Sequence, residues 1–303
     1  MGSVEAKGFS RATFHREGPV GPLITVTVKC RTAENPVLKE KRAVLQFKED
    51  LLKTPVAKDV VSLLSGYFKL LSIQGVRGTE TVGSWEEAMK RRVDMAISVG
   101  GDGTLLGVSR FLPPEVPILG VSMGGRGAIV EVGPNDLPLV MKTIEEGDYY
   151  LEKRLRIASK IGDFTTYHSL NELYIRRAHF YSTPTFRISS EAGFEIDRRM
   201  DGIIVATPTG SSGYNLSNRG PVLIETMQSL ILNPVMPIDM LPAIVIPPAK
   251  VNISCNDSLY VILDGQVSYE VKPGEKVHIY RGDDLTLVKL SRTSLHQFSR
   301  IFK

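Results

Sequence analysis

Cysteine is scarce in this chain, and its histidines are scattered. Cys30 and Cys255 are the two cysteines among 303 residues, and they form no Cys-x-x-Cys pair. The five histidines have no spacing typical of metal ligands: His15, His168, His179, His278 and His296. The sequence therefore predicts neither a disulfide framework nor a redox dithiol nor a structural zinc site.

Long hydrophobic runs and charge blocks are also absent. No apolar run reaches the roughly 18–20 residues that cross a bilayer, and the first residues lack the charged-then-apolar pattern of an export signal. We therefore expect a cytoplasmic protein with no membrane partner. The net charge of +4 is spread along the chain, which disfavours nucleic-acid binding and is compatible with an anionic small molecule.

The composition is that of a globular protein, with 42% hydrophobic and 23% charged residues, and the length allows two domains. In the first half, apolar runs alternate with amphipathic stretches. The pattern predicts strands at 23–29, 95–99 and 116–121, and helices at 39–52, 60–71, 85–92, 104–111 and 136–146. This alternation predicts an α/β domain over residues 21–148 with an open, mostly parallel, Rossmann-like sheet.

In the second half of the sequence, the alternation of strand and helix patterns gives way to short β-rich runs. One helix is predicted at 218–232, among short β-rich runs separated by turn signals. The runs are 156–161, 172–176, 185–189, 202–206, 243–246, 250–255, 259–263, 275–280 and 285–290. Residues 149–290 are therefore predicted to form a β-rich, β-sandwich-like domain. Residues 1–20 are expected to be a flexible arm, and 291–303 to pack back on the first domain.

The turn Gly100-Gly101-Asp102-Gly103-Thr104 separates a predicted buried strand from a helix. Glycines let backbone N–H groups approach a ligand, and the helix start adds free N–H groups and a positive dipole end. In open α/β sheets, ligands bind at the carboxyl ends of the strands. A phosphate or a ribose fits there, with Asp102 accepting from a hydroxyl or acting through a metal ion. The alternative is a tight turn in which Asp102 and Thr104 cap the helix.

Three further segments carry chemistry only in combination. A second glycine-rich turn, 120–127, follows the next predicted strand and could form one rim of a cleft. The segment 201–221 runs from a buried strand into a turn dense in hydroxyls and glycines, whose Tyr214 could pack on a ring. Asn171-Glu172 begins a strand, where the amide offers a donor and an acceptor and the carboxylate can accept from ribose hydroxyls.

Together these segments resemble the NAD kinase family. Its pattern is a GGDGT turn, an Asn-Glu pair, a TPTGSTAY-like turn and a late Asp-Gly-Gln. All four occur here in that order, as 100–104, 171–172, 207–214 and 264–266. The resemblance covers residues 94–270. The GGDGT turn is shared with other kinases, so the 207–214 turn is the more specific part.

The resemblance implies phosphoryl transfer from ATP, with Mg²⁺ or another divalent metal, to the 2′-hydroxyl of the adenosine ribose of NAD, giving NADP. Asp102 matches the general base, Asn171 and Glu172 the residues that hold adenine and its ribose, and Asp201 a residue near the nicotinamide end. Arg199 is added as a phosphate or carboxamide contact. The nucleotide-binding set comprises Gly101, Asp102, Gly103, Thr104, Asn171, Glu172, Arg199, Asp201, Thr207, Thr209, Gly210, Ser211, Ser212, Gly213 and Tyr214.

Further expectations concern mechanism and assembly. Because an aspartate with a pKa near 3.9 is a weak base for an alcohol, we expect Asp102 to orient the hydroxyl first and to take its proton late. The metal is expected to arrive with the nucleotide, with no protein ligand assigned. The family's nicotinamide end is often completed by a neighbouring subunit, which implies a homodimer or homotetramer.

The chain departs from the family pattern at several positions. Ser122 stands for Asn, Ala128-Ile129 for Phe-Leu, and Asn218-Arg219 for small residues, and Pro237 lacks its following His. The lost aromatic places stacking on adenine in question. Two other functions stay open at this point: a lipid or sphingoid-base kinase sharing the GGDGT turn, and a non-catalytic NAD(P)-binding sensor. The donor is equally open between ATP, another nucleotide and polyphosphate.

Overall fold

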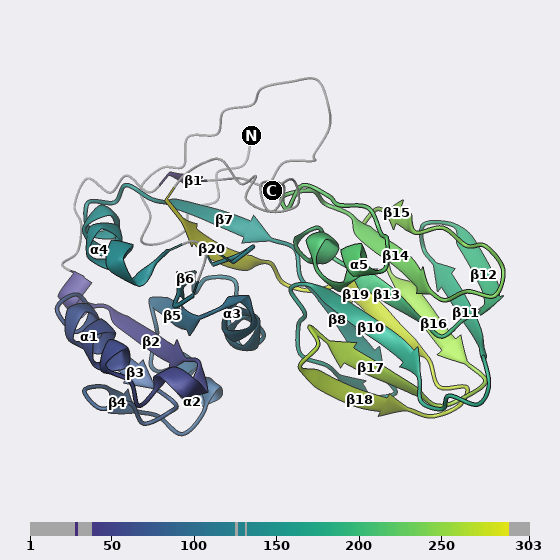
Figure 1. The fold of residues 1–303 in the computed structure, drawn as a ribbon, viewed down its shortest axis with the longest axis horizontal. Helices are drawn as coiled ribbons and strands as arrows, with labels where there is room; N and C mark the ends of the chain where they lie inside the picture. Colours follow the sequence, from purple (N-terminus) through teal and green to yellow (C-terminus); the bar gives the residue numbers. More distant parts are fainter. Residues whose placement is uncertain (1–27, 30–37, 125–126, 131, 291–303) are drawn as a thin grey trace, which may run out of the picture.

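The computed structural model describes residues 28–29, 38–124, 127–130 and 132–290, which form two domains lying side by side (Figure 1). The predicted arm at 1–20 and the segment 291–303 lie outside these residues. In the part of the chain that the structure describes, no helix is both long and apolar enough to span a bilayer.

The first domain is built on an eight-stranded sheet in the order β1-β7-β20-β6-β5-β2-β3-β4. The pairs from β4 to β20 are parallel, whereas β7 is antiparallel to both β20 and β1. The strands are β1 (Val28–Lys29), β2 (Arg42–Phe47), β3 (Lys69–Ser72), β4 (Glu80–Thr81), β5 (Met95–Gly100), β6 (Ile118–Ser122), β7 (Tyr150–Arg154) and β20 (Leu285–Lys289).

Helices cover both faces of this sheet (Figure 1). Helices α1 (Pro55–Leu64) and α4 (Leu137–Glu145) pack on one face, and α2 (Trp85–Lys90) and α3 (Asp102–Ser109) on the other. Short 3-10 turns are η1 (Leu38–Glu40), η2 (Glu49–Leu51) and η3 (Pro134–Asp136). Because both faces are covered, the central strands read as continuous apolar runs; every residue of β5 is buried.

The second domain is a sandwich of two six-stranded antiparallel sheets around a shared apolar core. One sheet, which we call the site sheet, consists of β15 (Ile244–Ile246), β14 (Leu230–Val235), β13 (Gly202–Ala206), β10 (Glu172–Arg177), β17 (Leu259–Leu263) and β18 (Val267–Val271). The other consists of β12 (Phe194–Arg199), β11 (Thr185–Ser190), β16 (Val251–Cys255), β19 (Val277–Arg281), β8 (Ile157–Ile161) and β9 (Phe164–Thr165). The predicted fold class, an α/β domain followed by a β-sandwich, is confirmed.

Three predicted helices are wrong in whole or in part. Residues 39–52 contain strand β2 rather than a helix. The range 60–71 holds the end of α1 and then β3. The range 218–232 contains no helix: α5 (Tyr214–Ser217) ends just before it, and β14 begins at Leu230. The strands β3, β4, β7, β9, β12, β14 and β18 were not predicted.

Two strands from the second half of the chain belong to the sheet of the first domain. Both β7 and β20 fall within 149–290, the range predicted for the second domain, yet they pair with each other and join the first sheet. The chain therefore leaves the first domain after β7 and returns to it at β20. These two strands form the connection between the domains (Figure 1).

Candidate active site

The glycine-rich turn lies where β5 ends and α3 begins. Gly101 is the N-cap of α3, so neither Asp102 nor Thr104 occupies the capping position that the alternative reading gave them. Gly100 is confined, because a Cβ at this position would overlap the Thr104 side chain. The turn therefore requires glycine for close packing, and it presents the amino end of an eight-residue helix at the carboxyl edge of the sheet.

The Asp102 carboxylate points toward the turn that follows β6. Its Oδ2 accepts a hydrogen bond from the Ala128 N–H at 2.7 Å, and Oδ1 accepts from Ile129 and Val130, each at 3.1 Å. A Cβ at Gly127 would overlap Asp102 Oδ1. Gly127, the last residue of the second glycine-rich turn, and the three residues after it therefore fix the direction of the Asp102 side chain.

The Asn-Glu pair stands at the start of β10, in the site sheet. The Asp264 carboxylate accepts backbone hydrogen bonds from Leu170 at 3.2 Å, Asn171 at 2.8 Å and Glu172 at 3.2 Å. The buried Asn171 Oδ1 and Glu172 Oε2 have no hydrogen-bond partner among the described residues. Two acceptor atoms are thus held in place by a rigid backbone and left available to a ligand.

Burial controls the protonation of these carboxyl groups. Desolvation, and then the charge of nearby Asp264, raise the pKa of Glu172 to about 8. Burial also raises the pKa of Asp264 to about 6, although its backbone hydrogen bonds act in the opposite direction. At neutral pH the Glu172 side chain is therefore mostly a neutral acid, able to donate one hydrogen bond and accept others.

The hydroxyl-rich turn packs directly against the Asn-Glu pair. The Thr207 N–H donates to the Asn171 carbonyl at 2.9 Å, and a Cβ at Gly210 would overlap the same carbonyl. A Cβ at Gly213 would lie 3.7 Å from Glu172 Oε2. Two of the predicted site segments, 171–172 and 207–214, are therefore in contact. The turn comprises η4 (Thr209–Ser212) and the first residue of α5.

Most hydroxyls of this turn are engaged within the chain. Thr207 Oγ1 donates to the Leu170 carbonyl at 2.5 Å, and Ser211 Oγ donates to the Pro208 carbonyl at 2.7 Å. Thr209 Oγ1 accepts from the buried Arg154 guanidinium at 3.3 Å. Within the turn 207–214, Ser212 and Tyr214 have side chains that are partly or largely exposed. The first three hydroxyls shape the turn, which leaves its surface to Ser212 and Tyr214.

Asp201 and Arg199 lie at the other end of β13. Asp201 Oδ1 is 3.1 Å from Arg177 Nε, and six residues separate it from Thr207, about 20 Å of extended chain. Tyr174 lies between them on β10, with its ring 5.1 Å from that of Tyr214. Arg199 ends β12 in the other sheet, and its Nε donates to the Thr183 carbonyl at 3.1 Å. Asp201 thus shares the site sheet with the Asn-Glu pair, whereas Arg199 points to its own hairpin.

One residue joins the two domains at the glycine-rich turn. Gln266 Nε2 donates to the Gly103 carbonyl at 2.7 Å, and Gln266 Oε1 accepts from Arg110 at 2.5 Å. Gln266 lies two residues after Asp264, in the β17–β18 hairpin whose Asp264 and Gly265 have positive φ. A single tight turn therefore fixes both the backbone of the Asn-Glu pair and the start of α3.

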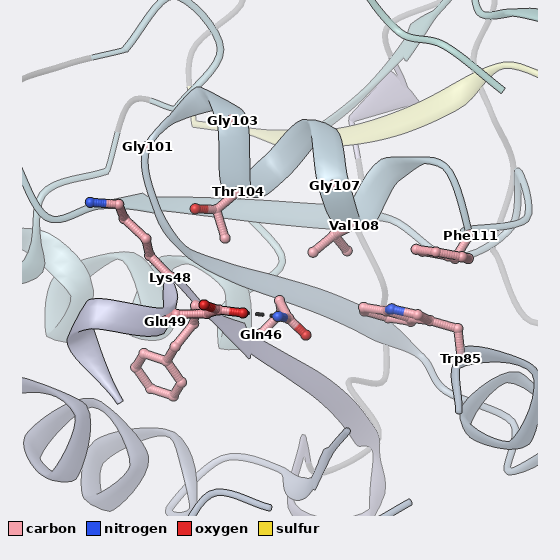
Figure 2. A pocket seen from close by; sticks show the side chains of 11 residues that line it. Gln46, Lys48, Glu49, Trp85, Gly101, Gly103, Thr104, Gly107, Val108 and Phe111 are labelled. Carbon is pink, nitrogen blue, oxygen red and sulfur yellow. Dashed lines mark hydrogen bonds between the residues drawn. The ribbon is translucent and has the colours of Figure 1, made fainter. Parts of the chain in front are cut away.

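A pocket of about 470 Å³ opens on the other side of this helix start (Figure 2). It is lined by the ends of β2 and β5, by α3 and by the start of α2. Its walls include Lys48, Thr104, Trp85 and Phe111. Of the predicted site residues, Gly101, Gly103 and Thr104 line it. The sequence interpretation missed Lys48, Trp85, Phe111, Arg110 and the Gln266 contact; a correctly predicted strand at β2 would have pointed to Lys48.

Both halves of the chain match one family. The model described as the ATP-NAD kinase N-terminal domain matches residues 29–149, and the ATP-NAD kinase C-terminal domain matches residues 170–289. An NAD kinase of Geobacter metallireducens is 32% identical over 221 residues, which cover 70% of this chain and 78% of that protein. An NAD kinase of Methanopyrus kandleri is 36% identical over 184 residues, covering 59% and 66%.

Solved structures share the fold. Yeast NADH kinase complexed with NADH superposes with a TM-score of 0.77 at 15% identity, covering 94% of this chain and 92% of that chain. An NAD kinase from Archaeoglobus fulgidus in complex with ATP gives a TM-score of 0.67 at 24% identity, covering 86% and 97%. With the two matched domains and a relative 32% identical over most of its length, the chain belongs to the NAD kinase family of phosphotransferases.

Proposed function

We propose that this protein transfers the terminal phosphoryl group of ATP, or of another donor, to the 2′-hydroxyl of the adenosine ribose of NAD, and so makes NADP. The observation that carries the proposal is the 264–266 turn. Asp264 holds the Asn171-Glu172 backbone, and Gln266 holds the Gly103 carbonyl, one residue from Asp102. The residues proposed to hold the acceptor and the residue proposed to activate it are thereby fixed to one another.

The site sheet supports an extended acceptor. Glu172 and Tyr174 alternate with the core residues Leu173 and Ile175, so they share the face opposite the core. Adenine and its ribose would lie at Asn171, Glu172 and the 207–214 turn. The nicotinamide half would extend along β10 and β13 toward Asp201, past the Tyr174–Tyr214 ring pair. Arg199 contributes less directly, since its side chain is engaged with Thr183.

Asp102 is proposed to orient the acceptor hydroxyl. Its carboxylate is held by three backbone N–H groups, so it keeps a defined direction when substrate binds. Phosphoryl transfer passes through a loose transition state in which positioning and charge neutralisation supply most of the acceleration. The hydroxyl proton would then pass to Asp102 late in the step, while the terminal phosphoryl moves from the donor to the 2′-oxygen.

A divalent metal is part of the proposal, as a companion of the nucleotide. Mg²⁺ keeps several waters and is bound through phosphates and one or two carboxylates. Glu49 is a carboxylate on the wall of the pocket beside the glycine-rich turn. A single carboxylate is compatible with an ion that the phosphates bring with them. Its chemistry there would be to neutralise charge on the transferring group.

A homodimer or homotetramer is also proposed, in a cytoplasmic protein. Met236, Ile238 and Met240 are 72%, 56% and 97% exposed. The Ile238 N–H donates to the Arg199 carbonyl, and the Asp201 N–H donates to the Val235 carbonyl, so this apolar segment lies beside the proposed nicotinamide end. Clustered exposed apolar residues mark contact surfaces. Light scattering after gel filtration is expected to give a multiple of 33.4 kDa.

The test of the proposed activity is a donor-by-acceptor matrix. ATP, other nucleoside triphosphates and polyphosphate would each be combined with NAD and NADH in the presence of Mg²⁺ or Mn²⁺. Product would be measured with an NADP-specific dehydrogenase. We expect NADP from at least one pair. If no pair gives product while NAD still binds, the protein is a dinucleotide sensor and not a kinase.

A further inference from the structure

The side chain of Gln266 contacts both ends of helix α3. Its Nε2 donates to the carbonyl of Gly103, in the first turn of the helix, and its Oε1 accepts from Arg110, the C-cap residue. A Cβ added at Gly103 or Gly107 would lie 3.6 or 3.4 Å from the Gln266 amide, which is van der Waals contact. These two glycines, one helical turn apart (Figure 2), therefore let the amide lie directly against the helix.

Arg110 reaches this amide from the carboxyl end of the same helix. Side chains on a helix point toward its amino end, so the guanidinium extends back toward the glycine-rich turn. Arg110 is 9% exposed, and in the described part of the chain its guanidinium makes no ion pair and one hydrogen bond, to Gln266. The guanidinium is therefore held by the helix that carries it and by one amide from the other domain.

The two contacts determine which way the Gln266 amide faces. A glutamine side chain has one acceptor atom and one donor group. If the amide were turned over, its NH₂ would face the guanidinium and its oxygen would face the Gly103 carbonyl. Gln266 is exposed, so water competes for the neutral bond to Gly103. The bond from the charged donor Arg110 is the stronger of the two, and it selects the orientation in which Nε2 meets the Gly103 carbonyl.

The turn that carries Gln266 is fixed to the acceptor side of the site. Asp264 and Gly265 have φ of 48° and 67°, and the Gln266 N–H closes the turn with a 2.8 Å hydrogen bond to the carbonyl three residues earlier. The Asp264 carboxylate is bonded to the backbone of the Asn-Glu pair. The distance from this pair to Gly103, and so to the neighbouring Asp102, is therefore set at this end of α3 by the Gln266 side chain.

We propose that Arg110 is a positioning residue for phosphoryl transfer, acting through Gln266. The guanidinium orients the amide, the amide holds the Gly103 carbonyl, and the Asp102 carboxylate is thereby placed at the acceptor hydroxyl. The inference rests on the proposed function and assigns a role to a residue outside the acceptor site. Because a displacement of about 1 Å can cost about 100-fold in rate, loss of this support should lower kcat and leave acceptor affinity nearly unchanged.

Gln266→Glu separates positioning from stability. The new carboxylate still accepts from Arg110, now as an ion pair, but it offers no donor to the Gly103 carbonyl. We expect a Tm within about 4 °C of wild type, the range that one exposed ion pair covers. The kcat should be at least about tenfold lower. The KM for NAD should stay within about threefold, because Asp264 still holds the Asn-Glu backbone. A kcat at the wild-type level would overturn the inference.

A double-mutant cycle tests whether Arg110 acts through Gln266. Arg110→Met should lower kcat about tenfold, and Arg110→Lys, which keeps a charged donor, should recover part of this loss. In the Gln266→Ala background, Arg110→Met should lower kcat no further, because the amide that it orients is already gone. Arg77→Met, on an exposed arginine between β3 and β4, is the control and should leave kcat unchanged.

The cycle also tests a second route from Arg110 to the site. Burial raises the pKa of Asp264 to about 6, while its backbone hydrogen bonds and then the charge of Arg110 lower it. A route through this charge does not need the Gln266 amide. If Arg110→Met lowers kcat as much in the Gln266→Ala background as in the wild-type protein, Arg110 does not act through Gln266 and the inference is wrong.

Hydrogen exchange measures the same support without an activity. The Leu105 N–H bonds the Gly101 carbonyl at 3.3 Å, and amides at this start of α3 should exchange several-fold faster in Arg110→Met and Gln266→Glu. Amides of β10 should be unchanged. If NADP forms but the variants keep wild-type kcat, the role of Arg110 is wrong and the kinase stands. If no donor gives NADP, the proposed function fails, and unchanged exchange at the start of α3 would then also reject the support by Arg110.

Discussion

At the scale of single residues, the environment of Asp102 determines what a substitution there would do. Three backbone N–H groups donate hydrogen bonds to its two carboxylate oxygens. Asp102 does not cap α3, whose N-cap is Gly101; its side chain instead joins the glycine-rich turn to the segment 127–130. A carboxylate can satisfy all three donors at once. An amide has a single acceptor oxygen, and its NH₂ group would face a donor. The two side chains are similar in shape but not in their hydrogen bonds.

Asp102→Asn is therefore expected to lower kcat by about 10²–10⁴-fold, the usual contribution of a positioned proton acceptor. The Kd for NAD should stay within a few fold, because the residues proposed to hold the adenosine are elsewhere. Steady-state kinetics together with calorimetric NAD binding would measure both values. Asp136→Asn, on an exposed aspartate at the start of α4, is the matched control. A kcat close to wild type would remove Asp102 from the mechanism.

Glu172 is a second residue whose surroundings make a measurable prediction. Burial raises its pKa to about 8, above its ordinary value of 4.5. Between pH 4.5 and 8 the unfolded chain loses this proton while the folded chain keeps it. The unfolded state then binds fewer protons, so the free energy of unfolding falls as pH rises through this window. Glu172 therefore stabilises the fold least above pH 8.

Glu172→Gln removes this titration while preserving the shape of the side chain. The variant should match wild type in Tm near pH 4.5 and exceed it by several degrees near pH 8.5. Asp264 also titrates in this range, with a pKa raised to about 6, but it does so in both proteins. Thermal melts from pH 4 to 9 would measure the difference. Two curves that stay parallel over the whole range would contradict the raised pKa of Glu172.

At the scale of elements, the turn at 127–130 acts as a support for the start of α3. Gly127 approaches Asp102 so closely that any Cβ would overlap Oδ1. Gly127→Ala should therefore push the carboxylate aside and lower kcat at least tenfold. Gly124→Ala is the control, since a Cβ there meets no atom of the described residues within 4 Å. Equal activity of the two variants in the NADP assay would show that the direction of Asp102 is unimportant.

Local patterns predicted those elements whose signals do not depend on partners. Strand β5, a short apolar run ending in glycines, and the alternating strands β10, β11 and β16 are examples. The β2 segment failed because charged residues flank it on both sides and both of its faces are buried. It therefore has neither the alternation of a half-buried strand nor a polar face, and the flanking charges imitate an amphipathic helix.

The predicted helix at 218–232 failed for a backbone reason. Helix α5 ends at Ser217, and Arg219, two residues later, has a φ of +58° that no α-helix continues. A Cβ at Gly220 would overlap the Asn215 amide, and Pro221 follows. The polar turn then packs against β14, whose Asn233 bonds Asn215 and Asn218. Apolar spacing alone could not reveal a network made by tertiary contacts.

The residues of the candidate site also fall into two groups: those that a local motif predicts and those that only the tertiary structure brings to the site. Motif segments named Asp102, Asn171, Glu172 and the 207–214 turn, because each lies at a strand end with unusual composition. Lys48 and Trp85 carry no such signal; they line the same pocket as the glycine-rich turn because β2 lies beside β5 and α2 packs on the same face of the sheet as α3. Residues far apart in the sequence become a pocket through the strand order, which local patterns do not specify.

At the scale of the whole molecule, Arg156 connects the two domains. It is fully buried, and it lies between β7 and β8, where the chain crosses from the first domain to the second. Its guanidinium donates to the carbonyls of Ser109 at 2.5 Å and Leu112 at 3.0 Å, at the end of α3, and of Asp283 at 2.7 Å, just before β20. Burial lowers its pKa to about 10, so the side chain remains charged at neutral pH. The end of α3 is thereby fixed to both strands that link the domains.

Arg156→Met should remove the side-chain donor from all three carbonyls; the Ser109 carbonyl would keep the Leu112 N–H, and those of Leu112 and Asp283 would lose the donor described above. Each unpaired buried group costs about 1–3 kcal/mol, so the free energy of unfolding should fall by about 3–5 kcal/mol. Because the link between the domains is weakened, calorimetry should show two separated transitions where the wild type shows one.

Arg156→Lys, which keeps the charge but reaches fewer carbonyls, should be intermediate between wild type and Arg156→Met in its free energy of unfolding. Arg187→Met, at a largely exposed ion pair, should cost under about 1 kcal/mol. If Arg156→Met unfolds in one transition at the wild-type temperature, the domains are held together by other contacts, of which Gln266 to Gly103 is the next to test.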